Sequence, residues 1–169
     1  MKKQKKRVVY PVPEEEVSTV EEYAPMQTTT DLRMILGGEK AVAQPLINDA
    51  DLISLARKGI KLASVVSVSE HLSISMSKMS ELLHTSQRTF QRKKKTDIMS
   101  TYISEQTIEI AQIVSRGLEI FSTREEFNNW LATPLLAFGN QPPLNYLDTT
   151  FGTQFILKEL GRLQHGVYS

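Results

Sequence analysis

The sequence predicts an all-α fold, and three observations support that class. Apolar residues recur at steps of three and four positions, most clearly over residues 103–121, as they do on one face of a helix. Capping residues and glycines stand at the ends of these segments. No pair of alternating segments joined by a hairpin turn occurs in the chain. We therefore expect helices packed around a shared core.

The first part of the chain, residues 1–27, is expected to form a flexible, disordered charged tail. Pro11, Pro13 and Pro25 interrupt this segment, and its charges come in blocks of one sign. Apolar periodicity is missing, so the segment has no face to bury against a core.

Three helices are predicted between residues 28 and 72, each with a cap or a glycine at one end. The first is expected to be capped by Thr30 or Asp31 and to stop at Gly37. The second starts near Asp49 or Asp51 and stops at Gly59, and the third covers residues 62–72. In the third segment the valines leave a strand as the alternative, although the three- and four-residue spacing favours a helix.

Residues 76–95 have the pattern of a helix-turn-helix. Ser86 caps the second helix, which is predicted to run over 87 to about 94. Phe90 is the only large apolar residue of that helix and must face inward. The polar and basic neighbours of Phe90 are therefore expected on the outer faces.

Helices are also predicted through the C-terminal part of the chain. Their limits are residues 103–121, residues 124–132 with Thr123 and Glu126 as a capping box, residues 143–147 after Pro142, and residues 150–163. The apolar residues that the last helix is expected to bury are Phe151, Phe155, Ile156, Leu160 and Leu163.

Composition bounds the class of protein. The chain has 169 residues, of which 40% are hydrophobic and 23% charged, and this balance is ordinary for a globular protein. Cysteine is absent, which excludes disulfides, thiolate catalysis and cysteine-ligated metals. No stretch is apolar for long enough to span a membrane, and the basic residues 2–7 lack the apolar core of a signal peptide. We expect a cytoplasmic protein with no membrane partner.

Charge is segregated along the chain. Residues 52–95 hold nine basic and two acidic residues, whereas residues 8–51 hold two basic and nine acidic residues. A positive block in a chain whose formal net charge is only +1 is typical of a surface that binds a polyanion. Chance clustering of surface lysines is the alternative.

No catalytic or metal site is predicted. His71, His84 and His165 lie far apart, and none has a second histidine at a metal-binding spacing. Adjacent glutamates such as Glu125 and Glu126 do not face each other on a helix, so they do not form an acid–base pair. We expect no catalytic residue, no metal and no cofactor, with a small enzyme or a scaffold as the alternative class.

The helix-turn-helix coincides with the positive block, and this coincidence predicts DNA binding. Arginine can bond two atoms of guanine and glutamine two atoms of adenine in the major groove, while hydroxyl and lysine groups suit phosphates. The candidate DNA-binding residues are Ser86, Gln87, Arg88, Thr89, Gln91, Arg92, Lys93 and Lys94. A dimer is expected because operators read by this motif are usually two-fold symmetric.

Over about residues 50–169, the sequence resembles a known family, the antitoxins of the Xre/MbcA/ParS group. The matching segments are Thr85-Ser86-Gln87-Arg88-Thr89-Phe90-Gln91-Arg92, Trp130-Leu131-Ala132-Thr133-Pro134, Pro142-Pro143-Leu144, and Arg162-Leu163-Gln164-His165-Gly166-Val167-Tyr168. The chain departs from the family where Phe138 and Gln164 stand in place of a glycine and an acidic residue.

The resemblance implies an Xre-like helix-turn-helix domain over residues 28–98 and a helical toxin-binding domain over residues 99–169. It further implies a cognate RES-domain toxin that consumes NAD⁺, and an antitoxin that represses its own operon by binding operator DNA. The implied toxin-binding residues are Arg162, His165, Gly166, Val167, Tyr168 and Ser169. Two alternatives stay open: the tail merely ends the last helix, or the chain is a stand-alone dimeric transcriptional regulator without a toxin.

Overall fold

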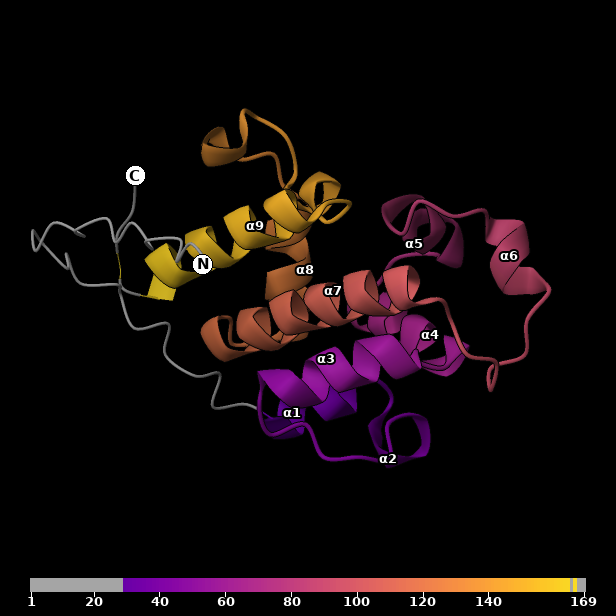
Figure 1. Ribbon diagram of the computed structural model, residues 1–169. Coiled ribbons are helices and arrows are strands. Elements are labelled where there is room, and N and C mark those ends of the chain that lie inside the picture. Colours follow the sequence, from indigo (N-terminus) through magenta and orange to yellow (C-terminus); the bar gives the residue numbers. More distant parts are fainter. Residues whose placement is uncertain (1–28, 165, 167–169) are drawn as a thin grey trace, which may run out of the picture.

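The computed structural model describes residues 29–164 and Gly166 (Figure 1), so the predicted tail over 1–27 lies outside the described residues. The described part is helical and contains no strand, only two isolated bridges. Its elements are α1 (Thr29–Ile35), α2 (Gly38–Ala41), α3 (Asp49–Lys58), α4 (Leu62–His71), α5 (Met76–Leu82), α6 (Gln87–Gln91), α7 (Thr101–Ile120), α8 (Arg124–Ala132), the 3₁₀ turns η1 (Leu136–Phe138) and η2 (Pro143–Tyr146), and α9 (Thr150–Gln164). The predicted all-α class is confirmed, and residues 62–71 form a helix rather than the alternative strand.

Short polar side chains set where most of these helices begin. The capping side chains that accept a backbone N–H are Asn48, Ser75, Ser86, Ser100 and Thr123. Each of these residues has an extended backbone and satisfies one of the N–H groups that the first helical turn leaves without a partner. At α3 the cap is Asn48, one residue before the predicted start, and Asp51 returns the second bond of a capping box.

The long helix α7 occupies the centre of the fold. It packs against α1, α3 and α4 from the N-terminal part and against α8 and α9 from the C-terminal part. Ile110, Ile113 and Val114 on α7 are fully buried. The predicted apolar stripe is therefore buried, and one continuous core joins the two halves of the chain.

One predicted core residue is wrong. Phe151 is 87% exposed, although the sequence pattern placed it inside with the other apolar residues of α9. The inner face of α9 instead runs through Gly152, Ile156 and Leu160, which repeat every four residues and are buried. Gly152 sits directly against the Tyr146 carbonyl, so its neighbour Phe151 points away from the core.

Two predicted helix limits also differ from the structure. The helix α1 begins at Thr29, so the predicted start at Thr30 or Asp31 lies inside it. The helix α6 ends at Gln91, whereas the prediction extended it to about Lys94. The chain turns after α6 because the Lys94 N–H donates to Asp97 Oδ2 at 3.0 Å, and the Asp97 N–H returns a bond to the Lys94 carbonyl at 2.9 Å.

The ends of the molecule carry different parts of the chain. Helix α6 and the segment after it lie at one end in Figure 1, and the C-terminal end of α9 lies at the other. The candidate DNA-binding residues and the candidate toxin-binding residue Arg162 are therefore well separated in space.

Candidate functional site

Helix α6 presents a polar and basic surface because one apolar residue fixes its orientation. Phe90 is buried against α5 and the core, and Ser86 caps the helix by accepting the Thr89 N–H at 3.2 Å. The Ser86 and Thr89 hydroxyls also lie 2.9 Å apart, within hydrogen-bonding distance. The exposed side chains on α6 and at its C-terminal cap are Gln87, Arg88, Gln91 and Arg92.

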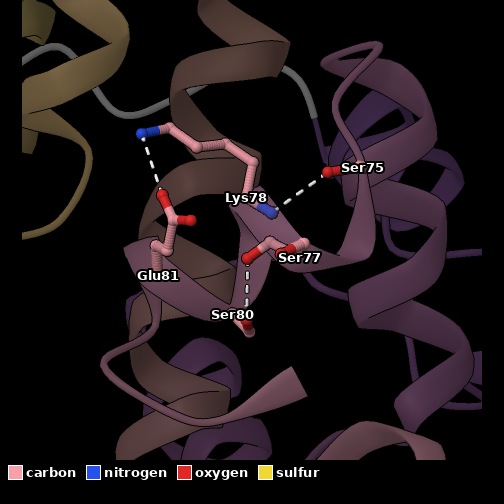
Figure 2. A network of polar contacts seen from close by, with 5 residues as sticks. All are labelled: Ser75, Ser77, Lys78, Ser80 and Glu81. Atoms are coloured by element: carbon pink, nitrogen blue, oxygen red, sulfur yellow. Dashed lines mark hydrogen bonds and ion pairs between the residues drawn. The ribbon is translucent and has the colours of Figure 1, made fainter.

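Helix α5, which supports α6, is fixed by its own polar contacts (Figure 2). The Ser75 hydroxyl accepts the Lys78 N–H at 3.1 Å, and the Ser80 hydroxyl donates to the Ser77 carbonyl at 2.7 Å. The Lys78 ammonium pairs with Glu81 at 3.2 Å. Lys78 is therefore a locally compensated charge, unlike the basic residues that follow α6.

The turn between α5 and α6 is closed by backbone bonds and by one unusual residue. The Thr85 N–H donates to the Ser80 carbonyl at 2.9 Å, and the His84 N–H donates to the Glu81 carbonyl at 3.1 Å. His84 has a φ of 47°, the left-handed conformation that glycine most often supplies after a helix. The structure thus contains the predicted helix-turn-helix, with the predicted turn residues between its helices.

The basic segment after α6 is paired with the start of α4. The Leu62 N–H donates to the Asp97 carbonyl at 2.9 Å, and the Ala63 N–H donates to the Lys95 carbonyl at 2.9 Å. These bonds satisfy N–H groups that the first turn of α4 would otherwise leave free. They also bring the lysines after α6 beside the basic residues around the end of α3.

We call the resulting group the basic surface, and it extends the site beyond the residues that the sequence indicated. Its members are Arg57, Lys58, Lys61, Lys93, Lys94 and Lys95. Lys58 bonds the neutral Gln44 side chain at 2.9 Å and Lys61 the Lys40 carbonyl at 2.8 Å. Within the described part of the chain, no member pairs with a carboxylate.

The candidate DNA-binding residues predicted from the sequence do not include Arg57, Lys58 or Lys61. All three lie in the positive block over residues 52–95, which is the signal that the sequence offers for them. Only the pairing of residues 95–97 with the start of α4 shows that the two groups are neighbours.

At the opposite end, the structure describes two of the six predicted toxin-binding residues. Arg162 lies in the last turn of α9, has a 45% exposed side chain and pairs with Glu159 at 3.0 Å. Gly166 has a φ of 68° and donates its N–H to the Leu163 carbonyl at 3.1 Å. The other four, His165, Val167, Tyr168 and Ser169, lie outside the described residues.

An aromatic cluster holds the C-terminal elements together beside α9. Neighbouring rings lie with centroids 4.7–6.3 Å apart, and its members are Phe121, Phe127, Trp130, Phe138, Tyr146 and Phe155. Six of the seven neighbouring pairs are tilted or edge-to-face, and Phe127 and Trp130 are stacked with an interplanar angle of 18°; aromatic rings favour offset-stacked and edge-to-face packing. Leu136 on η1 and Phe151 on α9 are apolar residues of the C-terminal part that stay exposed, with 82% and 87% of their surface accessible.

Other kinds of site find no support among residues 29–164. That part contains no group of three His, Asp or Glu side chains able to hold a metal ion. His71 Nδ1 instead lies 2.8 Å from the Ser67 carbonyl, and His84 Nε2 lies 2.8 Å from the Asp148 carbonyl. None of the described helices is both long and apolar enough to cross a membrane.

Two family models match the chain, one over the part that contains the helix-turn-helix and one over the C-terminal part. Residues 51–112 match the antitoxin Xre-like helix-turn-helix domain, and residues 116–166 match the antitoxin Xre/MbcA/ParS C-terminal toxin-binding domain. Together they define a DNA-binding antitoxin of a toxin–antitoxin system. The chain belongs to the Xre-type antitoxins, a class that is generally not enzymatic. No curated protein matches it significantly.

Proposed function

We propose that this antitoxin neutralises a cognate RES-domain toxin that consumes NAD⁺, and that it represses its own operon by binding operator DNA as a homodimer. The observation that carries the DNA half is the exposed polar and basic surface of α6, which leads along the chain into Lys93, Lys94 and Lys95; none of these basic groups pairs with a carboxylate within the described residues. The toxin-binding part of the proposal is supported by the family match over residues 116–166. It is also supported by the segment over residues 162–168, which resembles the family's C-terminal segment. The division into residues 28–98 and 99–169 stays a prediction, since the two matched ranges meet inside α7.

On the DNA side, α6 and the residues after it suit two kinds of contact, one with base edges and one with phosphates. Gln87 and Arg88 stand at its N-terminal end, the part of a recognition helix that meets base edges in the major groove. Lys93 and Lys94 stand after its C-terminal end and suit phosphate oxygens. In this proposal Ser86 and Thr89 act mainly by holding the start of α6, because each already bonds the other.

On the toxin side, Arg162 is accessible in the last turn of α9. Its side chain is 45% exposed, whereas the Glu159 carboxylate with which it pairs is only 13% exposed. In this proposal a carboxylate in the toxin's cleft binds the exposed side of the guanidinium, in the paired geometry that arginine favours, while Glu159 stays in place. Residues 165–169 then follow Arg162 into the cleft.

The test is co-expression with the product of the neighbouring gene, measuring cellular NAD⁺ and protection of the upstream DNA. Arg162→Glu is expected to bind DNA normally yet fail to preserve NAD⁺. Arg88→Ala is expected to preserve NAD⁺ yet lose sequence preference. Lys158→Glu is the matched control for charge reversal, because Lys158 is exposed one turn earlier on α9. The toxin half fails if the neighbour does not lower NAD⁺ or if Arg162→Glu still protects it.

A further inference from the structure

The helix α5 is bracketed by two turns that both contain a left-handed residue with a side chain. Ser73, before α5, has a φ of 54°, and His84, after α5, has a φ of 47°. This conformation is uncommon for residues other than glycine and persists where neighbouring groups hold it. Contacts from other parts of the chain are therefore needed to hold the backbone conformation of both turns.

Those outside contacts come from the C-terminal half of the chain. Asn128 on α8 donates from Nδ2 to the His71 carbonyl and to the Ser73 hydroxyl, both at 3.0 Å. His84 Nε2 lies 2.8 Å from the Asp148 carbonyl, just before α9. The turns before and after α5 are thus both joined to the half that matches the toxin-binding domain.

The groups that hold the turns are themselves fixed. The Asp148 carbonyl also accepts a bond from Gln106 Nε2 at 3.2 Å, and Gln106 is buried on α7. Asn128 follows Phe127, whose ring is fully buried. Displacing either anchor would therefore disturb the core, so the anchors act as fixed points for the turns.

We infer that His84 and Asn128 are positioning residues for DNA binding, through which the toxin-binding half sets the orientation of α5 and α6. Helix α6 has only five residues and rests on α5 through Phe90. A tilt of α5 therefore moves the side chains of α6 that are proposed to meet the bases. Contacts to two atoms of a base tolerate displacements of only about 0.5 Å, so small tilts reduce affinity. The inference goes beyond the proposed function but depends on α6 as the DNA-binding element.

Substitutions at residue 84 separate positioning from stability. His84→Gly removes the Nε2 donor but suits the positive φ, so its unfolding temperature is expected to stay close to that of the wild type. His84→Gln keeps a donor of similar reach but suits the positive φ less well. If positioning matters, His84→Gly binds DNA about five- to tenfold more weakly. His84→Gln then stays within about twofold of the wild type, as expected if the Nε2 bond rather than stability decides binding.

The probes are a duplex from the region upstream of the gene and a random duplex of equal length, with thermal unfolding measured in parallel. Asn128→Ala is an independent check and is expected to weaken binding in the same direction. The inference is overturned if His84→Gly binds like the wild type, or if affinity simply follows unfolding temperature across the variants. If the wild type binds both duplexes equally, base reading by α6 fails and autorepression and the positioning role fail with it; if it prefers the upstream duplex and His84→Gly binds that duplex equally well, only the positioning role fails.

Discussion

Gly117 allows α7 and α8 to approach each other at the aromatic cluster. A Cβ atom at this position would collide with the Phe127 ring, which is fully buried and has no room to move. We predict that Gly117→Ala lowers the free energy of unfolding by about 1–3 kcal/mol, as overpacking does elsewhere. Urea unfolding followed by circular dichroism measures this change.

Gly161 on α9 is the matched control, because a Cβ atom there meets nothing within 4 Å. Gly161→Ala is expected to raise the free energy of unfolding by about 0.5–1 kcal/mol through helix propensity alone. Equal effects of the two substitutions would show that the contact with Phe127 does not limit the packing of α7.

Glu109 gives stability a pH dependence of its own. Burial raises the pKa of this carboxyl, Glu105 raises it further, and hydrogen bonds from Thr150 and Thr153 lower it in part. The folded state therefore holds this proton more tightly than the unfolded state does. The contribution of Glu109 to stability is full below the ordinary pKa and is lost as pH rises through the raised one.

We therefore predict that Glu109→Gln is more stable than the wild type at pH 7, and that this difference shrinks towards pH 4. A neutral amide avoids the desolvation of charge, and its single oxygen can still accept from one of the two threonines, which donate to different oxygens of the Glu109 carboxylate. Thermal unfolding of both proteins across this range measures the difference. A glutamine variant that is less stable at pH 7 would mean that the two threonine bonds outweigh the cost of burial.

At the scale of elements, the basic surface leads us to predict how DNA affinity depends on salt concentration. Lys58→Ala and Lys93→Ala should each weaken binding to specific and random duplexes alike. Each should also lower the slope of log affinity against log salt concentration by about 1, because one phosphate contact is lost. Fluorescence anisotropy titrations at several salt concentrations measure both effects.

Lys158→Ala on α9 is the control and should leave the slope unchanged, since Lys158 lies far from α6 in the fold. If Lys58→Ala behaves like this control, phosphate binding is confined to the lysines that follow α6.

Most helices could be predicted because their signals are local. The caps Ser75, Ser86 and Thr123 each stand directly before a periodic segment, and Gly59 ends α3 as expected. The exposure of Phe151 could not be predicted from the pattern, because it depends on the close approach of Gly152 to η2. An apolar residue at the edge of a helical face fits two orientations, and a neighbouring element chooses between them.

The candidate site, too, could be predicted only where its signals are local in the sequence. The exposed residues of α6 could be predicted from the single apolar anchor Phe90 and from the charge block. The contacts of His84 with Asp148, and of Asn128 with Ser73, join residues more than fifty positions apart. No periodicity or spacing signals such a pair, so the connection between the halves becomes visible only in the folded chain.

At the scale of the whole molecule, the C-terminal end should be separable from the fold. Helix α9 ends at Gln164, whose side chain bonds Arg116 at the end of α7. We predict that truncation after Gln164 leaves the unfolding temperature and DNA binding unchanged, yet fails to protect NAD⁺ in cells that express the toxin. Loss of Arg116 contacts is avoided because Gln164 is retained. Full protection by the truncated protein would place inhibition on the helical surface instead.

Trp130 is the only tryptophan of the chain, and it is half-buried between the rings of Phe121, Phe127 and Phe138. Its fluorescence therefore reports on the C-terminal half alone, without any label. A spectral change on adding DNA would be an optical signal that originates away from the duplex, carried from α6 through the turns of α5 to α8. The only tryptophan of the chain thus offers an optical test of whether DNA binding at α6 is transmitted to α8.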